Sequence, residues 1–212
     1  MDNTIVPTKQ RILNCAVDLF ASKGYTETSV RDIATAVGIK PASLYNHFLS
    51  KEDLLQFMLN DFGDHTKKMY NNPDMPDILR ENPTADGILS CLQLSLDVLS
   101  DEYYVKVLYV IFHEQHRNGI FRNYVAKTIM DSEEHIERIF AVLKDLKVIH
   151  HDADADFWKK TASSLLYDFP NRRMLEIGHG FPDFSGMDLR GILFFMFDMA
   201  LKMYRITENR VT

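Results

Sequence analysis

The sequence has few of the features that mark secreted, membrane-spanning or metal-binding proteins. Only two cysteines occur in 212 residues, and their spacing is not that of a metal site, so a reducing compartment is expected. The first residues contain no apolar signal-peptide core. The longest apolar run, residues 192–204, is too short to span a bilayer and includes two charges. We therefore expect a cytoplasmic protein without membrane contact.

Signatures of enzymatic chemistry are also missing. No glycine-rich phosphate loop, G-x-S-x-G motif or Cys/His nucleophile arrangement occurs. Segment 113–117 resembles the zinc-protease signature H-E-x-x-H, but its last position is Arg117. A later segment rich in His and Asp lacks the Gly and Glu that a calcium loop requires, although metal binding by His150, His151 and Asp152 stays open. We expect neither an enzyme nor a cofactor.

What is present indicates an all-α globular protein. Hydrophobic residues make up 46% of the chain, enough to bury a core, and they recur at helical spacing without strand alternation or repeats. The net charge of −6 is unevenly distributed: residues 1–51 carry six Lys or Arg against four Asp or Glu, a net of +2, which leaves −8 for the remaining 161 residues. This asymmetry marks a boundary between a mildly basic head and an acidic body.

Residues 28–53 read as two short helices separated by a glycine, the pattern of a helix-turn-helix. Val30, Ile33, Ala34 and Val37 form one apolar face. Gly38 ends this helix because glycine adopts a left-handed conformation without steric cost.

The second helix begins at Pro41, whose fixed φ suits the first helical position. It buries only Leu44 and Phe48, and its remaining side chains are small or hydrogen-bonding. Such side chains let a helix approach base edges in the major groove of DNA. Ser50 and Asp53 resemble a capping box for the following helix, which runs to about residue 70 and is weakened by Gly63.

Three phrases extend the pattern over residues 11–55. They comprise Phe20, Gly24, Tyr25, Thr28 and Ser29; then Ile33, Ala34, Ala36, Val37, Gly38 and Ile39; then Leu44, Tyr45, His47, Phe48, Ser50, Lys51, Glu52 and Leu54. In order and spacing this segment, about a quarter of the chain, resembles the N-terminal domain of the TetR/AcrR (tetracycline-repressor-like) transcriptional regulators. Lys40 and Ala42 depart from the family pattern, which often has Ser or Thr and Gly there. Lys40 cannot accept a backbone N–H, so Pro41 or Ser43 must replace the cap.

The resemblance implies a fold and a function. The fold is all-α, with a three-helix helix-turn-helix domain at residues 1–50 and a helical effector-binding and dimerisation domain at residues 51–212. The function is that of a homodimeric, ligand-responsive transcriptional regulator, a repressor released from a near-palindromic operator in double-stranded DNA by an unidentified small-molecule effector. An all-α dimeric ligand- or protein-interaction module that does not bind DNA remains the alternative.

The expected DNA contacts fall into two groups. Residues expected to approach bases are Lys40, Pro41, Ala42, Ser43 and Asn46. Residues expected mainly to hold phosphates are Thr28, Ser29, Tyr45, His47 and Lys51.

The resemblance also implies positions in the body. In the family several helices of the body surround a ligand cavity. The residues expected to contact an effector on the corresponding helices here are Phe62, Met69, Cys91, Tyr109, Phe112, His113, Phe121 and Trp158. The last two helices form the family's dimer interface, and the final one is apolar nearly all round, which favours a partner over the alternative of a central core helix. The expected interface residues are Trp158, Ala162, Leu165, Phe169, Leu189, Ile192, Met196, Met199, Ala200 and Met203.

Overall fold

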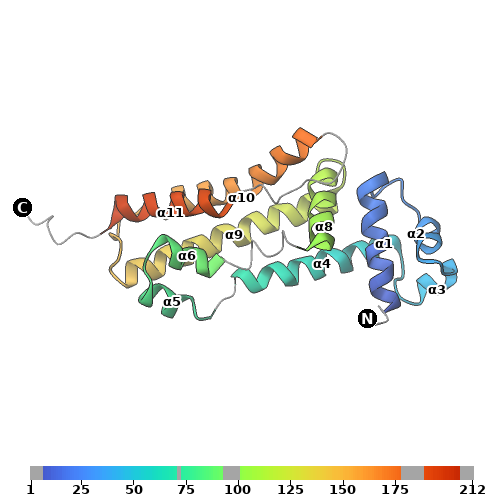
Figure 1. The fold of residues 1–212 in the computed structure, drawn as a ribbon, viewed down its shortest axis with the longest axis horizontal. Coiled ribbons are helices and arrows are strands. Elements are labelled where there is room, and N and C mark those ends of the chain that lie inside the picture. The colour runs from blue at the N-terminus through green and yellow to red at the C-terminus, as the bar shows by residue number, and fades with distance from the viewer. Residues whose placement is uncertain (1–6, 71–72, 93–100, 178–188, 206–212) are drawn as a thin grey trace, which may run out of the picture. The chain divides into compact units, whose positions relative to one another are not determined.

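The structure, a computed structural model, describes residues 7–70, 73–92, 101–177 and 189–205 (Figure 1). All regular secondary structure in these ranges is helical, apart from one isolated bridge between Ile149 and Arg205. The expectation of an all-α fold is confirmed. The helices are α1 Thr8–Lys23, α2 Val30–Val37, α3 Pro41–Tyr45, α4 Lys51–Tyr70, α5 Met75–Glu81, α6 Ala85–Leu92, α8 Glu102–Glu114, α9 Gly119–Asp145, α10 Ala155–Ile177 and α11 Leu189–Tyr204.

The chain divides into two compact units, which we call the head unit and the body unit. The head unit comprises Met1–His65 and Asp101–Val125, and the body unit comprises Thr66–Ser100 and Ala126–Thr212. The helix-turn-helix therefore shares its compact unit with α8 and the first residues of α9, which lie far away in sequence. The expected division into a DNA-binding domain at residues 1–50 and an effector-binding and dimerisation domain at residues 51–212 stays a prediction.

In the head unit α1 packs against both α2 and α8. Its apolar face supplies Ile12, Ala16 and Phe20, each at most 2% exposed. The guanidinium of Arg11 donates to the carbonyl of Val37 at 2.6 Å, so the last carbonyl of α2 has a cationic partner on α1.

Both ends of α2 are capped, and Gly38 ends the helix as the sequence predicts. The Ser29 hydroxyl accepts the N–H of Asp32 at 3.1 Å, while the Asp32 carboxylate accepts the N–H of Ser29 at 2.8 Å, a complete capping box. At the other end Gly38 has φ +77°, and its N–H reaches the carbonyl of Thr35. The capping box defines where α2 begins, and Gly38 defines where the turn between α2 and α3 begins.

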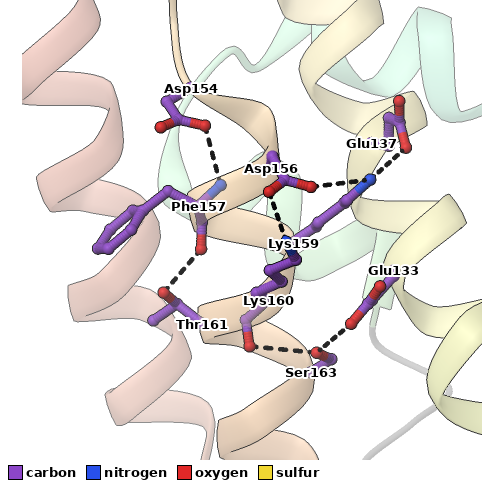
Figure 2. Close-up of polar contacts among 9 residues, drawn as sticks. All are labelled: Glu133, Glu137, Asp154, Asp156, Phe157, Lys159, Lys160, Thr161 and Ser163. Atoms are coloured by element: carbon purple, nitrogen blue, oxygen red, sulfur yellow. Dashed lines mark hydrogen bonds and ion pairs between the residues drawn. The ribbon is translucent and has the colours of Figure 1, made fainter.

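The body unit is built around an apolar core contributed by α5, α6, α9, α10 and α11. Polar groups join α10 to α9 in Figure 2: the ammonium of Lys159 lies between Glu137 and Asp156, and the hydroxyl of Ser163 donates to Glu133 at 3.1 Å. Asp154 caps α10 by accepting the N–H of Phe157 at 2.9 Å.

Candidate functional site

The second helix of the helix-turn-helix, α3, turns a row of small and polar side chains outward. Leu44 is fully buried and Phe48 is 2% exposed, so these two fix its inner side. Four predicted base-contacting residues are exposed and Ser43 is half-buried; the exposed ones are Lys40, Pro41, Ala42 and Asn46. The structure thus brings this group together on one surface, and their contacts with bases stay predictions.

The start of α3 shows how the departure at residue 40 is accommodated. Lys40 occupies the N-cap without a side-chain hydrogen bond, and Pro41 is the first helical residue. The carbonyl of Lys40 still accepts the N–H of Ser43 at 2.9 Å. Proline preorganisation replaces the missing cap, and the ammonium of Lys40 is left in solvent.

The predicted phosphate contacts divide into accessible and inaccessible residues. Ser29 and His47 are exposed, and Tyr45 is 51% exposed. Thr28 is only 1% exposed, and its hydroxyl donates to the carbonyl of Gly24 at 2.8 Å. The Thr28 hydroxyl is therefore used inside the chain to close the turn before α2, and a phosphate contact by this residue stays a prediction.

Lys51 also differs from the expectation. Its Nζ donates to the carbonyls of Tyr25 and Thr28, each at 2.8 Å, and to that of Thr26 at 3.3 Å. An ammonium has three donor hydrogens, so all of them have acceptors within the chain. In this conformation Lys51 has no hydrogen left for a phosphate.

Sequence reasoning missed Glu114, the last residue of α8. Its side chain is 3% exposed, and its Oε1 accepts the N–H of Tyr25 at 3.0 Å. A signal existed, because position 114 continues the buried face that contains Val107, Val110 and Ile111. Its hydrogen-bond partner, the backbone amide of Tyr25, lies 89 residues earlier, and no pattern of side chains in the sequence predicts that contact.

The predicted dimer residues lie on two different faces. Met199 and Met203 are 41% and 60% exposed, and Ile192 is half-buried. Four other predicted contacts belong to the core of the body unit and face inward within their own protomer; they are Trp158, Ala162, Met196 and Ala200. Their side chains pack in the apolar core of the body unit, so contacts between protomers by these four stay predictions. Leu165 is half-buried, and the side chains of Phe169 and Leu189 lie outside the described part.

Sequence reasoning also missed large exposed apolar side chains on α10 and α11, of which Phe195 and Phe157 are the most exposed. Phe195 is 64% exposed and Phe157 is 55% exposed. Phe195 follows the spacing of Met199 and Met203, so a finer division of the final helix into faces would have found it. In Figure 2 the ring of Phe157 is directed toward α11, which packs against α10.

The predicted effector residues occur in both units. In the head unit Phe62 is 4% exposed and contacts the rings of Tyr104 and Tyr124, whereas Phe121 is fully buried against Tyr25. The others there are Tyr109, stacked on the exposed His113, and Phe112, 8% exposed.

In the body unit Cys91 and Trp158 are core residues, and burial raises the pKa of the Cys91 thiol to about 11. The side chain of Met69 lies outside the described part. An effector site made by these residues stays a prediction.

The remaining candidates concern metals and membranes. His150 contacts Asp152, yet the described residues contain no group of three or more His, Cys, Asp or Glu arranged to hold a metal ion. Among the helices that the structure describes, none is long and apolar enough to cross a membrane.

The geometry defines a helix-turn-helix in an all-helical chain, and comparison with known proteins shows which proteins it is similar to. Residues 12–58 match the family model "Bacterial regulatory proteins, tetR family". The repressor KstR2 of Mycolicibacterium smegmatis is 45% identical over 56 residues, which are 26% of this chain and 27% of that protein. IcaR of Staphylococcus epidermidis, a negative regulator of a biofilm operon, is 36% identical over 104 residues, 48% of this chain and 51% of IcaR.

Solved structures extend the similarity in fold to nearly the whole chain. SmeT, the repressor of a multidrug efflux pump of Stenotrophomonas maltophilia, superposes with a TM-score of 0.63 at 18% identity, over 95% of this chain and 92% of SmeT. KstR2 of Mycobacterium tuberculosis gives 0.61 at 18% identity, over 96% and 98%. Residues 12–58 are thus similar to the DNA-binding domain of TetR-family regulators, and the fold of the chain is similar to theirs. Its sequence match covers only a quarter to a half of the curated relatives' length, so the similarity of its remaining residues is one of fold.

Proposed function

We propose that this chain is a homodimeric transcriptional regulator, a repressor that binds a near-palindromic operator in double-stranded DNA through α3. The observation that carries the proposal is the outward row of α3, where small and hydrogen-bonding side chains are exposed while Leu44 and Phe48 hold the helix from behind. A short helix with small outward side chains can bring its backbone close to base edges. The family match over residues 12–58 supports the same function.

The contacts then take different roles. Asn46 has both a donor and an acceptor and reads a base edge, while Lys40, Pro41, Ala42 and Ser43 approach bases around it. Ser29, Tyr45 and His47 hold phosphates on the flanks of α3, because their side chains are exposed there.

Dimerisation follows from an apolar stripe on α11, which we define as Ile192, Phe195, Met199 and Met203. These residues recur every three or four positions and therefore share one face of the helix. Three of them are at least 41% exposed, an arrangement typical of an interaction surface. Two copies of α3 can enter successive major grooves only when held about 34 to 36 Å apart, so a two-fold dimer explains both the stripe and a palindromic operator.

A small molecule releases the DNA in this proposal. One solved structure of SmeT is a complex with triclosan, and its fold matches this chain with a TM-score of 0.68 at 18% identity, over 95% of this chain and 93% of SmeT. We extend from that neighbour to a largely apolar effector held among the helices here. Such a ligand shifts the equilibrium only by its differential affinity for the DNA-competent and incompetent spacings of the two heads.

A mobility-shift assay with DNA from upstream of the protein's own gene tests the proposal. The unmutated protein should bind as a dimer, and Asn46→Ala should change its sequence preference. Asn60→Ala is the matched control, because Asn60 is an exposed asparagine on α4 that bonds Gln56. Absence of sequence-specific binding would favour the alternative, an interaction module that does not bind DNA. Sedimentation as a stable monomer would refute the dimer.

A further inference from the structure

The turn that joins α1 to α2, residues 24–28, is held by a cation from α4. The three hydrogens of the Lys51 ammonium reach the carbonyls of Tyr25, Thr26 and Thr28. The same ammonium lies 4.4 Å from the centre of the Tyr25 ring, within the range of a cation–π contact. Burial lowers the pKa of Lys51, and the negative charges of Glu114 and Glu27 oppose that shift. Lys51 therefore serves as an internal partner of the turn.

The same turn is held from another side by an anion at the end of α8. Glu114 accepts the N–H of Tyr25, the residue whose carbonyl Lys51 binds. A Cβ on Gly24 would lie only 3.1 Å from Oε1 of Glu114, and Gly24 has φ +89°, so glycine permits both the conformation and the close approach. A carboxylate that is 3% exposed is stable only when hydrogen-bonded and electrostatically compensated, and Tyr25 N–H and Lys51 supply these two needs.

The ring of Tyr25 completes the arrangement. It packs edge-to-face against Phe20 of α1 at 5.1 Å between ring centres and against Phe121 of α9 at 5.7 Å. The turn is thus fixed by directional bonds through its backbone and by aromatic packing through Tyr25. It leads directly into Ser29, the N-cap of α2, so whatever fixes the turn also fixes the start of the helix-turn-helix.

We propose that Lys51 and Glu114 are positioning residues of the DNA-reading head: they join the α1–α2 turn to the ends of α4 and α8, and Lys51 acts through three backbone carbonyls rather than through a DNA phosphate. A displacement of α8 along its axis is then passed by Glu114 to Tyr25 and so to α2 and α3. This inference rests on the proposed DNA binding for its effect on affinity, whereas the contacts themselves can be tested without DNA.

The first experiment separates a positioning lysine from a phosphate contact. Each phosphate contact that is lost reduces the slope of log affinity against log salt by about 0.9. Lys51→Met should weaken binding to upstream DNA at least about tenfold, because the turn loses its cation, yet leave the salt slope unchanged. Lys40→Met is the matched control: it removes an exposed cation beside α3 whose charge releases counterions from DNA even where it approaches a base, so the slope should fall. A slope lowered by about 0.9 in Lys51→Met, or unchanged affinity, would overturn the proposal.

The second experiment follows amide hydrogen exchange in residues 25–37 of the full chain. Glu114→Ala should speed exchange there at least about tenfold, since the N–H of Tyr25 loses its acceptor. Glu114→Gln should have a smaller effect because a carboxamide oxygen can still accept, and it carries the test if the alanine variant does not fold. Lys106→Ala is the control: it breaks the 2.7 Å ion pair between α8 and Asp18 of α1 without touching the turn.

The two experiments fail in distinguishable ways. If the unmutated protein binds no DNA, the proposed function fails, while exchange in the Glu114 variants still reports on the joint. If DNA binds but neither Glu114 variant changes exchange in residues 25–37, the joint does not exist and the positioning proposal is overturned.

Discussion

The head unit and the body unit are both helical, but different forces fix their parts. In the head unit the ends of α2 are located by directional bonds from side chains to backbone, made by Arg11, Lys51 and Glu114. In the body unit a continuous apolar cluster fills the space between helices, and exposed polar pairs such as Lys159 with Glu137 lie at its margin. Directional bonds set the orientation of the helices that they join, whereas apolar packing requires only that side chains fill the space between helices.

The difference fits what the proposed function requires of each unit. A reading helix must enter a groove at one angle, so a few bonds that tolerate little displacement suit the head. A helical body that holds a partner and an effector needs bulk stability and one uncovered apolar surface. Hydrogen bonds contribute about 0.5 to 3 kcal/mol each to the free energy of unfolding, and deletion of a large buried side chain costs more. Substitutions in the apolar core should therefore lower stability more than substitutions that remove one directional bond.

The largest effect is expected from Phe197→Ala in the core of the body unit. Phe197 is fully buried, and its truncation should lower the free energy of unfolding by about 3 to 5 kcal/mol, measured by urea denaturation. Phe195→Ala is the matched control on the same helix, because Phe195 is 64% exposed. It should leave folding of the isolated protomer nearly unchanged and weaken self-association in sedimentation. Equal losses of unfolding free energy would contradict the two-faced description of α11.

A smaller effect is expected when the head loses one directional bond. Arg11→Ala removes the 2.6 Å bond to the carbonyl of Val37 and should lower the free energy of unfolding by about 1 to 2 kcal/mol, since a charged donor is lost at the end of α2. Gln10→Ala should have almost no effect, because Gln10 is exposed and its side chain bonds Asn14 on its own helix. If both variants unfold alike, the bond to Val37 does not stabilise the head.

The capping box of α2 should contribute less again and depend on pH. Ser29→Ala should cost about 1 kcal/mol by chemical denaturation. Hydrogen bonds from Ser29 lower the pKa of Asp32 below its usual range. The stability that Asp32 supplies is therefore fully present above the unfolded pKa of about 3.9 and is lost as the pH falls through the lower folded pKa. The difference between the unmutated protein and Asp32→Asn should be constant from about pH 7 to 5 and shrink below pH 4; a constant difference down to pH 2 would exclude the box.

The sequence predicted much of this architecture because its signals are local. Helix periodicity, Gly38 and Pro41 fixed the position of the helix-turn-helix, and Ser50 does cap α4 by accepting the N–H of Asp53 at 3.0 Å. These features depend on residues within one or two turns of each other, so they can be read from a single chain.

The features that the sequence did not predict are contacts between residues far apart in the chain. The carbonyls that Lys51 binds lie 23 to 26 residues away, and Glu114 meets an amide 89 residues away. The faces of α11 could not be assigned because apolar residues surround it, so only its neighbours decide that Met196 is core and Phe195 is surface. Burial of polar groups by distant segments is decided by tertiary packing, which periodicity does not encode.

The smallest effect is expected at Gly63, inside α4. Replacing a helical glycine by alanine gains up to about 1 kcal/mol of helix stability. A Cβ at position 63 would lie 3.3 Å from the hydroxyl oxygen of Tyr124, closer than most such contacts. That oxygen is the far end of a half-buried side chain, so it can move a few tenths of an ångström. Gly63→Ala should therefore raise the free energy of unfolding by less than about 1 kcal/mol.

Tyr124→Phe sharpens this last prediction, because it removes the oxygen that the new Cβ would meet. Gly63→Ala should stabilise the Tyr124→Phe protein more than it stabilises the unmutated protein, and a double-mutant cycle on the free energy of unfolding measures the difference.

A stiffer α4 should also change the effector concentration needed to release DNA more than it changes DNA affinity without effector. Equal shifts in the two quantities would show that α4 does not transmit the effector's signal.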